Sequence, residues 1–344
     1  MTNFERVDAI LNGACGTQFT AAVARIEYRG RVVFERAYGA TRNDELALPV
    51  YADSRFDLAS LTKLFIATLL LRLVAQGRLA LDEPLSGVVP EWRRAPHDAI
   101  TARMLLAHTS GMNSGADYRE IMDRNVEQFA LRSELIADPG ERVIYSDLGF
   151  IAIGVILERV AGASLPAQIV SCFAPSLEFR PRAGQRLQIP ATEEDSWRGR
   201  VQGFVHDEKA YLMGGAAGHA GLFGTAAGVA SLTESYLAPL HSRRSALLPE
   251  PLVREAISEQ ASDPILRRGL GWALKTSDEN SCGRLMDRSS FGHTGFVGTS
   301  VWADPTRDLQ GVLLTNAVYF GREDIRDLRA AFYEAMVQTC SPSD

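Results

Sequence analysis

Several features that mark other classes of protein are missing from this 344-residue sequence. The net charge is −6 and no long run of one sign occurs, so nucleic acid is not an expected partner. The most apolar stretch, 64–71, is closed by Arg72 and is far too short to span a bilayer, so no membrane partner is expected. No apolar segment follows the first residues, which predicts a protein without a signal peptide.

The usual signatures of metal, phosphate and redox sites are also missing. The four cysteines are scattered without a C-x-x-C pair, which is typical of reduced thiols and predicts a cytoplasmic protein. No two histidines have the spacing of metal ligands, so neither a metal nor another cofactor is expected. The glycine-rich run 214–221 lacks the Gly-Lys-Ser/Thr of a phosphate-binding loop, and we exclude that function for it.

Strand patterns occur at both ends of the chain, with helical patterns between them. Alternating runs at 20–28 and 31–38 predict a β-hairpin, and further strands are predicted at 270–275, 299–303 and 309–315. Helices are predicted at 4–14, 61–77, 101–107, 117–136, 147–161 and 322–338. The sequence therefore predicts a single domain, 1–344, of mixed α/β (α+β) class. Its sheet region spans about 1–80 and 255–344, and a mostly helical region spans about 81–254.

The first motif that could carry chemistry is Ser60-Leu61-Thr62-Lys63, at the start of an apolar helix. A spacing of three places Ser60 and Lys63 on the same helical face. A serine hydroxyl needs a base before it becomes a good nucleophile, and a lysine can be that base only if its pKa is lowered. Burial and the helix dipole both act in that direction. The structural alternative is a helix N-cap followed by a surface lysine.

The second motif is Tyr145-Ser146-Asp147, just before another apolar helix. The phenol of Tyr145 could carry a proton between Ser60, Lys63 and a leaving group. The structural alternative is a ring packed under a loop, with Ser146 or Asp147 capping the helix.

The third motif is His293-Thr294-Gly295, in a predicted strand. Gly295 would let a substrate approach the strand closely. The N–H groups of Ser60 and Phe296 could then form an oxyanion hole. The structural alternative is a glycine at a β-bulge beside an incidental histidine.

In this order, the three motifs resemble the β-lactamase-related family, which includes penicillin-binding proteins, class C β-lactamases and related esterases. The matching pieces are SLTK at 60–63, YSD at 145–147 for the family's Y-x-N, and HTG at 293–295 for its K-T-G. Similar context surrounds them at 105–112, 149–162, 293–305 and 313–316. The resemblance implies a β-lactamase/transpeptidase-like fold, with a central antiparallel sheet flanked by helices and a helical inserted region. It also implies acylation of Ser60, with Lys63 and Tyr145 in proton transfer.

A further segment looks like the VHD…GGxAGHAGLF signature of an esterase-like branch of this family. It consists of VHDE at 205–208 and GGAAGHAG at 214–221. We expect the glycines to form a tightly packed loop and His219 to lie on the cleft wall, where it contacts substrate. For His206 and His108 we expect structural roles.

Two departures from the family pattern concern substrate choice. His293 replaces a permanently charged lysine, and Asp147 replaces an asparagine, so binding of an anionic substrate is expected to be weaker. Asp147, His219, His293, Thr294 and Gly295 are the expected substrate-binding residues. The leading hypothesis is a serine hydrolase that acts on small-molecule esters or amides through an acyl-Ser60 intermediate. Alternatives are a weak β-lactamase or D-amino peptidase, an acyltransferase, and a non-catalytic ligand-binding relative, which would not need Ser60, Lys63 and Tyr145 together.

Overall fold

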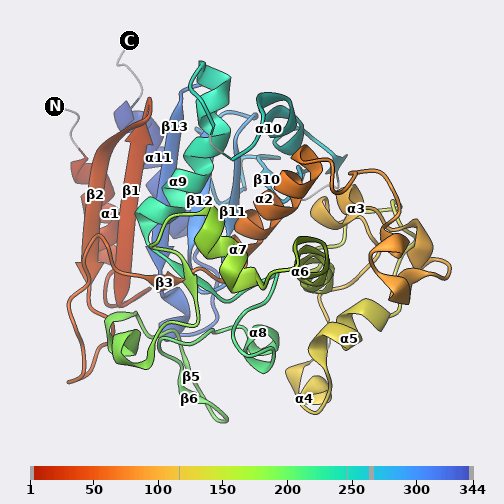
Figure 1. Ribbon diagram of the computed structural model, residues 1–344. Helices are drawn as coiled ribbons and strands as arrows, with labels where there is room; N and C mark the ends of the chain where they lie inside the picture. The colour runs from red at the N-terminus through yellow and green to blue at the C-terminus, as the bar shows by residue number, and fades with distance from the viewer. Residues whose placement is uncertain (1–3, 116, 246, 263–266, 341–344) are drawn as a thin grey trace.

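The computed structural model describes residues 4–115, 117–245, 247–262 and 267–340. Its central feature is an antiparallel sheet of eight strands (Figure 1). The order is β2-β1-β13-β12-β11-β10-β9-β8. The bounds are β1 Ala21–Tyr28, β2 Arg31–Gly39, β8 Ala261–Ser262, β9 Arg267–Arg268, β10 Ala273–Leu274, β11 Phe291–Thr294, β12 Ser300–Asp304 and β13 Leu309–Thr315. Because β1 pairs with β13, the sheet is assembled from both ends of the chain, as predicted.

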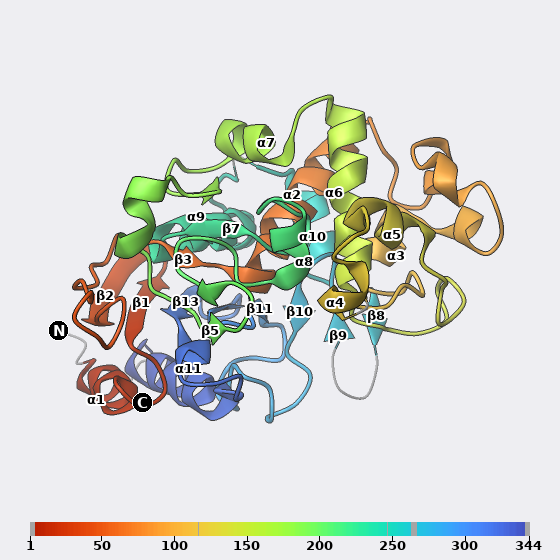
Figure 2. The same cartoon turned by 90° about the horizontal axis from the view of Figure 1, so that it is seen from below.

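Helices cover both faces of this sheet, which Figure 2 shows as a layer between them. On one face lie α1 (Glu5–Ala14) and α11 (Arg326–Cys340), and on the other lie α2 (Thr62–Ala75) and α9 (Ala226–Leu237). Alternate residues of β1 therefore enter different cores, with Ala22 and Ala24 on the α11 side and Val23 on the α2 side. β13 is buried along its whole length, because both of its faces are covered.

A second region of helices lies beside the sheet (Figure 1). It contains α3 (Ala102–Leu106), α4 (Tyr118–Ile121), α5 (Val126–Arg132), α6 (Asp147–Ala161) and α7 (Leu165–Cys172). α2 contacts the sheet region and also α6 and α7, so it is buried on nearly every side, as its apolar sequence predicted.

Two predicted elements differ from the structure. The helix predicted at 117–136 is broken into α4 and α5, because the Asn125 side chain accepts from the Gln128 N–H and starts a new helix. The strand predicted at 270–275 is reduced to the two residues of β10, next to Gly271 in a left-handed conformation. α9 lies in the predicted helical region of 81–254, yet it packs against β1, β12 and β13. The outermost residues of the predicted sheet region, 1–3 and 341–344, lie outside the described residues.

A small three-stranded sheet joins the segment before Ser60 to the glycine-rich segment. It contains β3 (Phe56–Asp57), β7 (Leu222–Gly224) and β4 (Glu178–Phe179), in the order β3-β7-β4. The hairpin of β5 (Glu194–Asp195) and β6 (Gly199–Arg200), and the helices α8 (Glu208–Leu212) and α10 (Glu250–Ala256), complete the fold. The pairing of β3 with β7 brings residues 57–63 next to residues 205–224.

Within the described part of the chain, no single helix is long and apolar enough to cross a membrane. The helices α6 and α7 are long and apolar enough only when they are taken together, and a bend of 76° separates them.

Candidate active site

Ser60 lies in a tight turn that leads from β3 into α2. The preceding residue, Ala59, has φ of 46°, a left-handed conformation that costs a non-glycine residue free energy. The Ala59 N–H donates to Asp57 Oδ1 at 2.8 Å, and the Leu61 N–H donates to the Leu58 carbonyl at 3.0 Å. These bonds hold the strained turn and leave Ser60 half-buried at the mouth of the helix.

The Ser60 hydroxyl meets two proton-carrying side chains. Lys63 Nζ lies 2.9 Å from Ser60 Oγ, and the Tyr145 hydroxyl lies 3.0 Å from the same oxygen. Lys63 comes from the first turn of α2, whereas Tyr145 comes from the segment before α6. Ser146 caps α6 by accepting from the Gly149 N–H at 2.8 Å, so this serine has the predicted capping role while the Tyr145 ring faces Ser60.

Two histidine rings and an arginine surround Tyr145. The ring centroids of His108 and His293 lie 4.7 and 6.2 Å from that of Tyr145, and the Arg268 guanidinium carbon lies 5.3 Å from it. His108 has the expected structural contact, since its Nδ1 accepts from the Ser146 N–H at 3.1 Å. His293 Nδ1 donates to the Thr294 carbonyl at 2.7 Å. Burial, and then the positive charges of Arg268 and Lys63, lower the pKa of His293 to about 3, so its ring is neutral near pH 7.

Lys63 is completely buried and forms an ion pair with Asp147. Lys63 Nζ lies 2.8 Å from Asp147 Oδ1 and donates to the His219 carbonyl at 3.2 Å. Burial acts to lower the pKa of Lys63, but the Asp147 carboxylate and Tyr145 act in the opposite direction, and the net result is a raised pKa. The sequence argument for Lys63 as a neutral base did not include the charge of Asp147, which opposes the effect of burial on the pKa of Lys63.

The ring of His219 lies inside the protein, which differs from the expected position on the cleft wall. Only 1% of His219 is exposed, and its Nε2 lies 2.7 Å from Asp207 Oδ1. It is the His219 main chain, through its carbonyl, that contacts Lys63. The ring of His206 lies 3.0 Å from Glu193, and its main-chain N–H donates to Asp57 at 2.7 Å, as a structural role requires.

Asp147, Asp207 and His219 are the residues nearest to a metal-binding arrangement in the described part of the chain. Their possible ligand atoms all lie within 4.8 Å of one another. However, Lys209 Nζ lies 3.3 Å from Asp147 Oδ2 and 3.8 Å from Asp207 Oδ2. Two ammonium groups, those of Lys63 and Lys209, therefore already neutralise these carboxylates.

The end of β11 packs directly against the turn that contains Ser60. The Gly295 N–H donates to the Thr299 carbonyl at 2.7 Å, and Thr299 Oγ1 donates to the Leu58 carbonyl at 3.1 Å. A Cβ atom at Gly295 would lie 2.1 Å from Thr299 Oγ1 and 2.8 Å from the Leu58 carbonyl, so only glycine fits there. Arg329 of α11 donates to the Gly295 carbonyl at 2.9 Å. Phe296 follows immediately, with its ring largely exposed.

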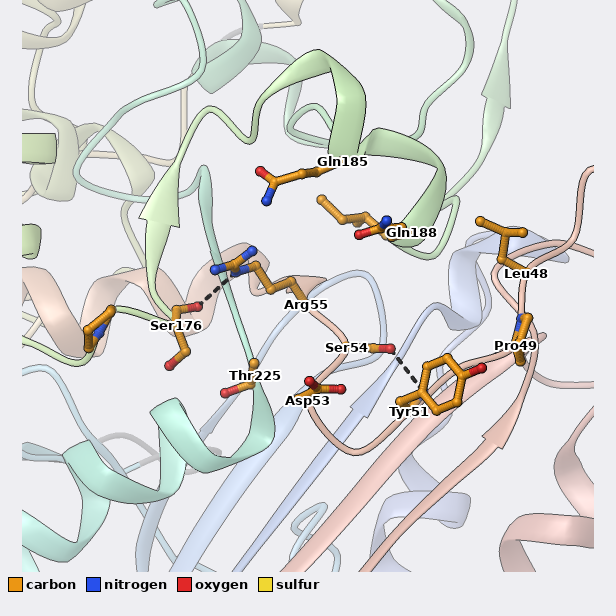
Figure 3. Close-up of a pocket in the computed structure, with 12 residues that line it drawn as sticks. Leu48, Pro49, Tyr51, Asp53, Ser54, Arg55, Ser176, Gln185, Gln188 and Thr225 are labelled. Carbon is orange, nitrogen blue, oxygen red and sulfur yellow. Dashed lines mark hydrogen bonds between the residues drawn. The ribbon is translucent and has the colours of Figure 1, made fainter.

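Two hollows lie near these elements. One, of about 590 Å³, is lined by Tyr145, His293 and Thr294, together with Arg268 and Arg329. A larger hollow of about 750 Å³, shown in Figure 3, has walls that include Tyr51, Arg55, Gln185 and Thr225 but neither Ser60 nor any of its partners. The first hollow is assigned to the candidate site because Tyr145, which contacts Ser60, lines it.

Sequence reasoning missed Lys209 and Arg268. Lys209 directly follows the segment 205–208, yet no local pattern showed that it meets Asp147. Arg268 comes from a strand of only two residues, too short for periodicity to reveal. Both are found only when distant segments are brought together.

The chain is similar to known proteins both in sequence and in fold. A family model described as Beta-lactamase matches residues 7–335. An N-acetylmuramyl-L-alanine amidase of Bacillus subtilis (strain 168) is 30% identical over 360 residues, covering 90% of this chain and 80% of that protein. Esterase EstB of Burkholderia gladioli is 28% identical, covering 92% and 91%. The structure of EstCE1, described as a hydrolase with promiscuous acyltransferase activity, has a TM-score of 0.77 at 22% identity, covering 96% and 98%.

Proposed function

Because the chain belongs to the Beta-lactamase family and is a serine hydrolase, we propose that Ser60 is the nucleophile and forms an acyl-enzyme with carboxylic esters or amides. One observation carries the assignment to Ser60. Its Oγ atom is within hydrogen-bond distance of both Lys63 Nζ and the Tyr145 hydroxyl, at the start of a buried helix. A non-catalytic ligand-binding protein would have no need for this convergence.

In the proposed acylation, Ser60 Oγ forms a bond to the substrate carbonyl carbon. Tyr145 accepts the Ser60 proton as its own proton passes to the leaving group, which departs as an alcohol or amine when its bond to the carbonyl carbon breaks. Lys63 remains an ammonium, paired with Asp147, and stabilises the negative charge that develops between the two oxygens. Water then attacks the acyl-enzyme, which releases the acid and restores the Ser60 hydroxyl.

The oxyanion of the tetrahedral intermediate would be bound by the N–H groups of Ser60 and Phe296. The support is the packing of Gly295 and Thr299 against Leu58, which places the peptide after Gly295 beside the Ser60 turn. Within the described residues, the Gly295 N–H is already used by Thr299, whereas that of Phe296 has no protein acceptor. A preorganised donor of this kind commonly contributes about 3–4 kcal/mol to catalysis.

A second candidate is hydrolysis of anionic amides, such as β-lactams or peptides that end in D-amino acids. The specific observation is Arg268, which lies over the Tyr145 ring and lines the same hollow as His293 and Arg329. These arginines put positive charge on the wall where His293 has none, and an arginine can bind a carboxylate through two hydrogen bonds. The substitution of lysine by His293 alone therefore does not determine the preference for neutral substrates.

The proposal is tested by labelling and by a panel of substrates. A fluorophosphonate should form one adduct, on the peptide that contains Ser60, and the Ser60→Ala variant should form none. Turnover of p-nitrophenyl butyrate, an aryl amide, nitrocefin and a peptide ending in D-Ala-D-Ala should then rank the substrate classes. Product analysis with an added alcohol would separate acyl transfer from hydrolysis. Labelling of a different serine, or unchanged turnover by Ser60→Ala, would remove the basis of the assignment.

A further inference from the structure

Lysine is rare in this chain, and its placement is not random. The sequence contains only three lysines among 36 basic residues, at positions 63, 209 and 275. Two of the three contact the same carboxylate, because Asp147 Oδ1 lies 2.8 Å from Lys63 Nζ and Asp147 Oδ2 lies 3.3 Å from Lys209 Nζ. A protein that uses arginine almost everywhere else therefore has a second compact ammonium next to the lysine that contacts Ser60.

Lys209 is held in this position from its other side. Its Nζ lies 3.8 Å from Asp207 Oδ2, and Asp207 is itself fixed because its Oδ1 accepts from the Ala210 N–H at 2.8 Å and lies 2.7 Å from His219 Nε2. The side chain of Lys209 is only 14% exposed. These contacts form a chain of alternating charge, Lys63–Asp147–Lys209–Asp207, that leads from Ser60 to α8.

We propose that Lys209 is a positioning residue that sets the protonation balance of Lys63 by sharing the Asp147 carboxylate with it. The inference rests on the proposed role of Ser60 and Lys63. By binding the second oxygen of Asp147, Lys209 withdraws part of the negative charge that holds the proton on Lys63. By its own charge it also repels the Lys63 ammonium. Lysine at 209 thus limits how strongly Asp147 holds the proton of Lys63, and keeps the pKa of Lys63 below the value that Asp147 alone would give it.

The other charged and titratable groups around Lys63 do not supply the same effect. From β9 and β11, Arg268 and the neutral His293 face the Tyr145 side of the site, and His108 packs against the Tyr145 ring. From the glycine-rich segment, His219 offers Lys63 its carbonyl while its ring faces Asp207. Among the described residues, the carboxylate in direct contact with Lys63 is that of Asp147, and Lys209 is the other ammonium that contacts it.

The small number of lysines allows a direct test that does not use enzyme activity. Of the two forms of a lysine amine, cyanate reacts only with the neutral one, so a change in the carbamoylation rate of the same lysine between folded variants at a fixed pH reports a change in its neutral fraction. After proteolysis, mass spectrometry resolves the three lysine-containing peptides. The protein would be treated with cyanate as wild type and as Lys209→Met, Lys209→Gln, Lys209→Arg and Asp207→Asn. Lys275→Met is the matched control, because Lys275 is also buried and donates to the carbonyls of Arg284 and Met286.

We expect Lys209→Met and Lys209→Gln to slow the carbamoylation of Lys63 roughly tenfold, the change for about one pKa unit. Lys209→Arg, which keeps the charge, should restore most of the rate, and Asp207→Asn should raise it. The control should leave the Lys63 rate unchanged. If Lys209→Met merely opened the structure, Lys63 would react faster, which is the opposite result and would overturn the proposal. Folded Lys209 variants with an unchanged Lys63 rate would also overturn it. Because the readout is independent of turnover, failure of Ser60 to become acylated would count against the proposed function alone.

Discussion

Replacing Asp147 by asparagine should change the charge state of Lys63 more than any other single substitution near Ser60. The two charged groups lie 2.8 Å apart, and Lys63 is fully buried. At an effective dielectric constant of about 20, their attraction amounts to roughly 6 kcal/mol, which is an upper limit of about four pKa units. Asparagine keeps a hydrogen-bond acceptor and Lys209 remains nearby, so we expect the pKa of Lys63 to fall by roughly 1–3 units.

The sign of the effect on stability follows from the directions of the two shifts. The pKa of Lys63 is raised in the folded protein, so its contribution is fully present below the unfolded value of about 10.4 and is lost as the pH rises through the folded pKa. The pKa of Asp147 is lowered despite its burial, chiefly by Lys63, so its contribution is lost as the pH falls through its folded pKa. Asp147→Asn should therefore destabilise the protein most between about pH 4 and pH 10, by up to about 3–5 kcal/mol.

The activity assay decides which role Lys63 has. An alkyl butyrate ester followed in a pH-stat gives kcat/KM over a wide pH range, and circular dichroism verifies folding at each pH. If Lys63 acts as an ammonium, the alkaline decline of kcat/KM should move to lower pH in Asp147→Asn, by the same roughly 1–3 units. If the acid side of the profile moves instead and activity rises at low pH, Lys63 acts as a neutral base and our assignment is wrong. No movement on either side would refute the ion-pair reasoning itself.

Four other substitutions or conditions test separate parts of the site. Ser60→Ala should abolish ester turnover and fluorophosphonate labelling while Tm stays near the parental value, and residual labelling of the variant would contradict the assignment. Tyr145→Phe removes the hydroxyl 3.0 Å from Ser60 Oγ and should lower kcat by roughly 10²–10⁴-fold with little change in KM. Gly295→Ala should lower the free energy of unfolding by roughly 1–3 kcal/mol and reduce kcat, because its Cβ would overlap Thr299 Oγ1; a parental Tm would show that the loop can move. Because the pKa of His293 is lowered to about 3, this residue should stay neutral between about pH 8 and about pH 5. The ratio of nitrocefin turnover to ester turnover should therefore not rise over that range, and a rise in this ratio with a midpoint near about pH 6 would show that His293 becomes charged.

The parts of the fold that follow from local sequence were predicted well. The hairpin of β1 and β2, the buried helix α2 and the capping of α6 by Ser146 depend on residues close together in the chain. The helix predicted at 117–136 was wrong because Asn125 starts a new helix, which a pattern of apolar residues does not register. The cytoplasmic location expected from the cysteines stays a prediction.

The electrostatic state of the site could not be predicted, because it depends on contacts between segments far apart in sequence. The motif Ser60–Lys63 indicated a lysine beside the serine, but not that Asp147 pairs with it. The same holds for His219, whose burial depends on Asp207 and whose contact with Lys63 is made through the main chain. Motifs thus identified the side chains that meet Ser60, while their charges were set by long-range packing.

The pairing of β1 with β13 bears on how the enzyme matures during synthesis. Residues 21–28 leave the ribosome well before their partner at 309–315 has been translated. The segment 295–299, which packs against Leu58 beside Ser60, is also translated long after Ser60 itself. A nascent chain that stops before residue 309 therefore carries SLTK in an unfinished site and exposes one edge of the hairpin, a surface prone to wrong pairing. The surroundings of Ser60 are therefore complete only after residues 295–315 have been synthesised.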